Sequence, residues 1–245
     1  MNDKALIKNV DSIRDKSKVL FCLPFAGGGA SAFGAWIKEL REAHIVVCPI
    51  QLPGREEKIM EAPYTDMKEL IRDLLEQIEQ FRDYEIYLFG HSMGAKLAYE
   101  VAKGLEQEQI KVRKLIVSGS RVVHIPEPNP ICRLPDKEFE EEIARFEGTP
   151  KEILENKELL AFFLPMLRAD FTMDETYYVD EIRKLNCPIV AFGGIDDQEA
   201  DEAAISRWTE YTDNDFGYQM FSGNHFFIRD YEEDVLLSIK RAIAE

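Results

Sequence analysis

The sequence predicts an α/β fold, in which a mainly parallel sheet is covered by helices on both faces. Short apolar segments rich in β-branched and aromatic residues alternate with amphipathic stretches whose apolar residues recur at helical spacing. Strands that alternate with helices in this way form a mainly parallel sheet between two helical layers. Six strands are expected, at residues 19–25, 45–48, 86–89, 114–118, 188–192 and 218–221. Ligands of such sheets bind beyond the carboxyl ends of the strands.

The bulk composition indicates one domain without a membrane segment. The chain has 245 residues, of which 45% are hydrophobic, and this is enough to bury a sizeable core. No apolar run approaches the ~18 residues of a membrane span. Residues 1–18 are charged and lack the apolar stretch of a secretory signal. We therefore expect a single domain over residues 1–245, a cytoplasmic location and no membrane partner.

Charge and cysteine usage narrow the possible partners further. The net charge of −16 disfavours nucleic acid and anionic membranes, since both are negatively charged. The cysteines show neither Cys-x-x-Cys nor any metal-ligand spacing, and they are Cys22, Cys48, Cys132 and Cys187. We expect buried free thiols in a reducing compartment and no bound metal.

A glycine-rich loop at residues 26–31 follows the first predicted strand and precedes an amphipathic helix. The loop lacks the Gly-Lys-Ser/Thr of a P-loop and the spacing of a dinucleotide-binding fingerprint. We interpret it as a loop whose bare backbone N–H groups face a reacting oxygen. The second strand leads into a turn-rich loop at residues 49–55, and a helix is predicted where apolar residues recur over 67–78.

The strand at 86–89 runs directly into Gly90-His91-Ser92-Met93-Gly94, and apolar residues at helical spacing follow. In this context Gly-x-Ser-x-Gly is a nucleophile elbow, a sharp turn that projects the serine hydroxyl clear of the backbone. Gly90 and Gly94 remove the Cβ atoms that would clash where strand and helix pass close together. The helix start directs free N–H groups toward Ser92, where negative charge would develop. The alternative is a glycine-rich turn of purely structural role.

The alternation of strands and helices stops at Arg121 and resumes only at about residue 184. This segment opens with three prolines and continues with apolar residues at helical spacing, through Phe139 and Ile143 and again from Leu159 to Leu167. We interpret residues 121–184 as a helical lid inserted over the active end of the sheet, which would exclude water and form the substrate channel. Ordinary core helices are the alternative.

The residues that follow the strands predict nucleophilic catalysis by serine. A serine hydroxyl needs an adjacent base, and a histidine base needs an acid that holds its tautomer. Ser92, an aspartate and His225 follow three strands, in the chain order expected of α/β-hydrolases. Of the other histidines, His91 cannot reach back to its neighbour, His44 precedes a strand, and His124 opens the predicted lid.

The acid is either Asp196 or Asp197, because only one of two adjacent residues can face the histidine. Asp197 lies three residues after Gly194, the usual offset from that turn, and is favoured. Aspartates at a turn are also common capping residues. An oxyanion hole would be formed by the backbone N–H groups of Met93, directly after the serine, and Ala26 in the first loop.

These residues carry a resemblance to the type II thioesterases associated with nonribosomal peptide and polyketide synthases, a branch of the α/β-hydrolase family. The resemblance covers nearly the whole chain, and its catalytic-core motifs are Pro24-Phe25-Ala26-Gly27-Gly28, Gln51-Leu52-Pro53-Gly54-Arg55, Phe89-Gly90-His91-Ser92-Met93-Gly94 and Gly223-Asn224-His225-Phe226. The more discriminating motifs lie in the predicted lid and are Leu134-Pro135-Asp136, Phe162-Phe163-Leu164-Pro165 and Leu167-Arg168-Ala169-Asp170-Phe171. Where many relatives have histidine in the first loop, this chain has Phe25.

The resemblance implies hydrolysis of acyl thioesters on the phosphopantetheine arm of carrier proteins, by a monomer that needs no cofactor and no metal. The long thin arm predicts a narrow tunnel to Ser92. Because carrier domains are usually acidic too, we expect weak, mostly apolar docking on the lid, with Arg121, Arg133 or Arg168 as local contacts. The alternatives are a carboxylesterase, lipase or acyltransferase of the same fold, a chain-terminating thioesterase, and a non-catalytic carrier-binding protein.

Overall fold

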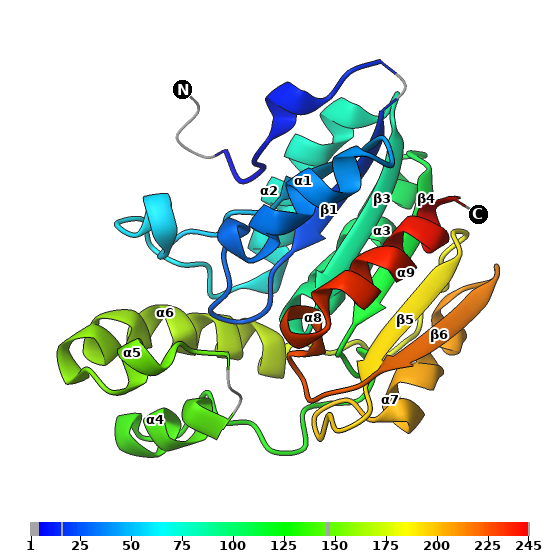
Figure 1. The fold of residues 1–245 in the computed structure, drawn as a ribbon. Helices are drawn as coiled ribbons and strands as arrows, with labels where there is room; N and C mark the ends of the chain where they lie inside the picture. The colour runs from blue at the N-terminus through cyan, green and yellow to red at the C-terminus, as the bar shows by residue number, and fades with distance from the viewer. Residues whose placement is uncertain (1–4, 16, 146–147, 245) are drawn as a thin grey trace.

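A computed structural model describes residues 5–15, 17–145 and 148–244. Its centre is a six-stranded sheet in the order β2-β1-β3-β4-β5-β6, in which all neighbouring strands pair in parallel (Figure 1). The strands are β1 (Lys18–Leu23), β2 (Ile45–Pro49), β3 (Glu85–His91), β4 (Val112–Ser118), β5 (Ile189–Gly194) and β6 (Phe216–Phe221). The α/β fold class expected from the sequence is confirmed, and the "mainly parallel" sheet is parallel throughout the described strands.

Helices cover both faces of the sheet, because successive residues of each buried strand point to opposite sides. In β1, Val19 and Phe21 face one apolar core and Leu20 and Cys22 face the other. The first core is covered by α2 (Met67–Ile78), α3 (Met93–Gln107) and α7 (Glu202–Ser206). The second is covered by α1 (Gly34–Arg41) and α9 (Glu232–Ala244), which contact each other.

The strand boundaries shift where turn chemistry intervenes. The first strand ends at Leu23 rather than continuing to residue 25, because Pro24 has no N–H to donate to a neighbouring strand. The last strand begins at Phe216, two residues earlier than expected. Its burial is low except at Phe221, so apolar alternation marks its start poorly. No pattern in the sequence predicts the short helix α7.

The segment 121–184 holds α4 (Asp136–Arg145), α5 (Lys151–Leu154) and α6 (Lys157–Thr176), and no strand among its described residues. These helices lie beyond the carboxyl ends of the strands (Figure 1). They share a small apolar core of their own, formed by Ile131, Phe139, Ile143, Leu160, Leu164, Met166 and Leu167. The C-terminal part of α6 packs on α3, with Met173 in the core beneath the sheet. The 121–184 segment therefore has an apolar core of its own and is joined to the rest of the domain through α6.

Other expectations from composition concern the cysteines and the membrane. All four cysteines are buried and free, and burial raises the pKa of the Cys48 and Cys187 thiols to about 12. Within the described ranges, no helix has the length and apolar character to cross a bilayer.

Candidate active site

Ser92 occupies the turn between β3 and α3 in a strained backbone conformation, with φ 56° and ψ −121°. Non-glycine residues rarely adopt positive φ, and such strain persists only where the surroundings enforce it. Two close backbone approaches enforce it here. A Cβ at Gly90 would lie 1.9 Å from the carbonyl oxygen of Gly94, and a Cβ at Gly94 would lie 2.1 Å from that of Leu23. The Ser92 N–H also donates to the Ser118 carbonyl at 2.8 Å.

His225 and Asp197 come together from the loops after β6 and β5. Their side chains form a hydrogen bond of 2.9 Å between His225 Nδ1 and Asp197 Oδ2. The Asp197 residue is 3% exposed, and its other oxygen accepts from the amides of Glu199 and Ala200. Asp196 is exposed to solvent instead. Of the two aspartates left open by the sequence, the structure therefore places Asp197 against the histidine.

Three of the predicted site residues line one pocket at the carboxyl ends of the strands. Ser92, His225 and Ala26 line it together, and its volume is about 70 Å³. Ile143 and Phe171 of the 121–184 segment line the same pocket. The pocket is thus bounded by both the sheet and the overlying helices.

The two amides predicted to form an oxyanion hole are both available. Met93 is the first residue of α3, where helix N–H groups have no intrahelical acceptor and the helix dipole is positive. In the first loop, Gly27 donates its N–H to Asp170 and Gly28 donates to the Phe25 carbonyl. Across the described residues, neither the Ala26 nor the Met93 amide has a hydrogen-bond acceptor.

His91, which the sequence excluded as the base, forms part of the wall behind His225. Its ring is fully buried, with its centroid 5.0 Å from that of His225, and its Nδ1 lies 3.0 Å from Ser118 Oγ. Burial holds the pKa of His91 well below its usual value. The His91 ring therefore stays neutral and packs against His225. His124 contacts Tyr211 and lies outside the described lining of the pocket.

The pocket also contains charged groups that sequence reasoning missed. Lys96 Nζ lies 2.8 Å from a carboxylate oxygen of Asp174, so this pair bridges α3 and α6 inside the pocket. Burial raises the pKa of Glu175 and of Glu199, which line the pocket as well. Only Lys96 had a signal in the sequence. It lies in the first turn of the helix that begins directly after Ser92, so a position near the serine could be expected.

A parallel sheet whose central strand ends in a strained serine turn, with an aspartate–histidine pair after later strands, defines an α/β-hydrolase-fold protein. Within that class, residues 18–243 match the thioesterase domain family. The match spans most of the chain, and the chain belongs to this family.

Individual relatives agree with the family match. The chain is 39% identical over 230 residues to the linear gramicidin dehydrogenase LgrE of Brevibacillus parabrevis, covering 92% of this chain and 87% of that protein. It is 36% identical to the gramicidin S biosynthesis protein GrsT of Aneurinibacillus migulanus, covering 89% and 85%. Among solved structures, the type II thioesterase BorB from the borrelidin biosynthetic cluster superposes with a TM-score of 0.86 at 31% identity, covering 96% of each chain.

Proposed function

We propose that this chain is a type II, or editing, thioesterase that hydrolyses acyl groups from the phosphopantetheine arm of carrier proteins in nonribosomal peptide or polyketide biosynthesis. Ser92, His225 and Asp197 act as nucleophile, base and orienting acid. The observation that carries the proposal is the 2.9 Å bond between His225 and Asp197, at the edge of the pocket that Ser92 also lines. Membership of the thioesterase family supports the choice of a thioester as the bond cleaved.

The reaction follows from the roles of these groups. Ser92 Oγ attacks the thioester carbon while its proton passes to His225, and Asp197 stabilises the imidazolium that forms. The tetrahedral oxyanion accepts hydrogen bonds from the Ala26 and Met93 amides. The C–S bond then breaks, and the sulfur leaves readily as a thiolate because thiols have a pKa near ~8.5. Water attacks the acyl-enzyme with His225 again as base, which releases the acid and restores Ser92.

The substrate in this proposal is long and thin. We expect the phosphopantetheine arm to reach Ser92 through a narrow tunnel beneath the helices that line the pocket. In this proposal residues 121–184 are the lid. Ile143 and Phe171 are its apolar contacts with the channel, and the separate apolar core of α4 and α6 lets it keep its shape as a layer.

Carrier proteins would dock on the lid through apolar contacts. Phe162 and Leu159 on α6 are 56% and 42% exposed. Of the arginines considered from the sequence, Arg121 is paired with Glu127, and Arg168 is bonded to Asp136 and to two backbone carbonyls. Arg133 is exposed and is the arginine best placed to meet an acidic carrier. Binding that strengthens sharply as salt is lowered would contradict this apolar mode.

Two other functions are alternatives to this proposal. An esterase or acyltransferase would keep the fold and the triad and differ in the bond cleaved. A redox role, suggested by the name of LgrE, finds no support in the first loop, which lacks the dinucleotide fingerprint. We further propose that the chain acts as a monomer in the cytoplasm. Sedimentation would test the oligomeric state, and cell fractionation would test the location.

The decisive experiment compares acetyl, aminoacyl and longer acyl groups loaded on a carrier protein with the matching oxygen esters. We expect faster turnover of the carrier thioesters. Ser92→Ala should abolish turnover while leaving carrier binding intact, as measured by titration calorimetry. If Ser92→Ala still turns over, the nucleophile is wrong. If oxygen esters are hydrolysed as fast as thioesters, the substrate class is wrong.

A further inference from the structure

We propose that Arg55 and Asp170 are positioning residues that hold the oxyanion amide of Ala26 in place, and that they do so by tying the first loop to lid helix α6. This inference rests on the proposed function, because it assigns these residues to the same reaction. Neither residue lines the pocket among its described walls. Both lie in motifs, at 51–55 and 167–171, to which the reaction itself gives no role.

The pair is a buried hub of hydrogen bonds. Asp170 Oδ2 accepts from the Gly27 N–H at 2.7 Å and from Arg55 Nη1 at 2.5 Å, and Asp170 Oδ1 accepts from Arg55 Nη2 at 2.8 Å. The guanidinium also donates to the Gly28 carbonyl at 3.0 Å and to the Pro53 carbonyl at 3.2 Å. One ion pair therefore fixes the backbone of two consecutive loop glycines.

Because both side chains are buried, the ion pair tolerates the loss of one partner poorly. The side chains of Arg55 and Asp170 are 4% and 0% exposed. Removing one member of a buried pair leaves the other charge without compensation, whereas replacing both by apolar residues is often tolerated. Bidentate arginine–carboxylate geometry also fixes orientation as well as distance. A buried, bidentate ion pair can therefore hold backbone groups at fixed positions.

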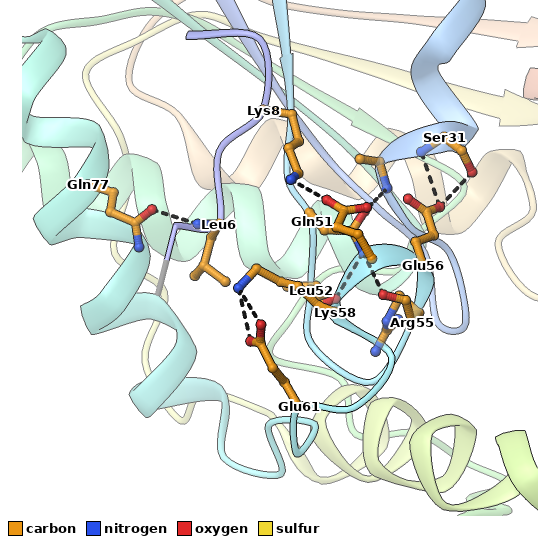
Figure 2. Close-up of polar contacts among 12 residues, drawn as sticks. Leu6, Lys8, Ser31, Gln51, Leu52, Arg55, Glu56, Lys58, Glu61 and Gln77 are labelled. Atoms are coloured by element: carbon orange, nitrogen blue, oxygen red, sulfur yellow. Dashed lines mark hydrogen bonds and ion pairs between the residues drawn. The ribbon is translucent and has the colours of Figure 1, made fainter. Parts of the chain in front are cut away.

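The rest of the first loop is held from the same side. Figure 2 shows Gln51, Glu56 and Ser31 in this contact region: Gln51 Oε1 accepts from the Ala30 amide at 3.0 Å, and Glu56 accepts from the Ser31 hydroxyl at 2.6 Å. Helix α6 closes directly on the loop, since a Cβ at Gly27, where φ is +80°, would lie 2.7 Å from Leu167. The loop is thus clamped between the 51–56 turn and α6.

The contacts of the first loop with the Arg55–Asp170 pair determine which of its amides remains available to the substrate. Gly27 donates to Asp170 and Gly28 donates to the Phe25 carbonyl, so of the amides of residues 26–28 only that of Ala26 remains free beside the pocket. Without Asp170, the Gly27 N–H loses its acceptor, and the Gly28 N–H bond to the Phe25 carbonyl alone is left to hold the turn. The Ala26 N–H would then turn away from the position of the oxyanion, and a misplacement near 1 Å costs about 100-fold in rate.

The test uses the full-length enzyme and an acyl-carrier thioester. Asp170→Asn and Arg55→Lys should each lower kcat about 100-fold, the loss expected when an oxyanion donor is misplaced by about 1 Å, while KM changes less than about twofold. Equal falls in kcat and kcat/KM mark an interaction made in the transition state. The rate of Ser92 labelling by an alkyl phosphonofluoridate should fall in step, because this reagent also develops negative charge on oxygen.

A double variant separates positioning from stability. Arg55→Met/Asp170→Leu removes both buried charges, so its melting temperature should recover relative to Asp170→Asn, yet kcat should stay low because Gly27 and Gly28 still lack their partners. Asp73→Asn is the matched control. It removes another buried carboxylate, one on α2 that is bonded to the Tyr64 hydroxyl and, among the described residues, makes no hydrogen bond with residues 26–31, and should leave kcat unchanged.

Two results would overturn this inference, and a third would overturn the proposed function alone. If kcat recovers together with the melting temperature in the double variant, the pair serves stability alone and the inference is wrong. If Asp170→Asn hydrolyses the thioester at the wild-type rate, it is wrong as well. If the wild-type enzyme itself does not hydrolyse carrier thioesters but labels at Ser92, the proposed function fails, while the labelling rates of the variants still test the clamp.

Discussion

Gly94→Ala is the perturbation that tests the geometry of the elbow most directly. The new Cβ would lie 2.1 Å from the Leu23 carbonyl oxygen and 2.8 Å from that of Pro24. The closest separation that real Cβ atoms show is 3.0 Å, which is 0.9 Å more than the 2.1 Å available. Both obstacles are backbone atoms at the stem of the first loop, so neither can swing aside as a side chain would. Helix α3 and the first loop must therefore separate by about that amount.

This displacement moves the proposed oxyanion donors apart, since Met93 starts α3 and Ala26 ends the loop stem. A shift near 1 Å predicts a loss of about 100-fold in kcat. Overpacking of this kind costs about 1–3 kcal/mol, which for a domain of this size lowers Tm by about 2–12 °C. Gly34→Ala is the matched control, because its Cβ would meet nothing within 4 Å. We expect that control to keep full activity and to gain up to about 1 kcal/mol in stability.

The assay is steady-state hydrolysis of an acyl-carrier thioester alongside calorimetric melting of both variants. The reasoning would be refuted by a Gly94→Ala protein with kcat within twofold of wild type and an unchanged Tm. Loss of activity in Gly34→Ala would equally show that glycine itself, and not the close approach, is what matters.

Two further predictions follow from the site. Asp197→Asn should lower kcat by about 10⁴-fold because His225 loses the acceptor that fixes its tautomer, whereas Asp196→Asn, at the exposed neighbour, should not; similar losses in both would contradict the assignment. His91 stays neutral in the fold because burial lowers its pKa from 6.5, so the stability it contributes is present above pH 6.5 and is lost as the pH falls toward the lowered folded-state pKa. Wild type should therefore lose up to about 1.4 kcal/mol per pH unit more than His91→Gln below pH 6.5, as measured by urea midpoints; parallel pH slopes would count against it.

Much of the fold could be predicted because its signals are local. Apolar segments such as 86–89 and 114–118 are buried on both faces, so each reads as a continuous β-prone run. All six strands were predicted, five of them from such buried runs, and the resemblance to thioesterases is confirmed by the family match. Local signals failed at β6, which is partly exposed, and at α7, which has only five residues.

The site was predictable to the extent that chain order encodes it. Ser92 and His225 each follow a strand, and parallel strands end at one edge. The choice between Asp196 and Asp197 was not settled locally, since both lie in the same turn. The structure distinguishes them by burial and by the bond to His225. Lys96 and Asp174 meet only because α6 folds back over α3.

By itself, the sequence determined that the sheet is parallel and which residues are candidates for the site at its edge, because strand patterning, glycine spacing and residue type are properties of short stretches. Only the tertiary structure decided which groups touch. The Arg55–Asp170 pair joins positions 115 residues apart, and no periodicity or local motif specifies such a contact. Its geometry arises from how the lid helix packs on the first loop, and that packing is a property of the whole fold.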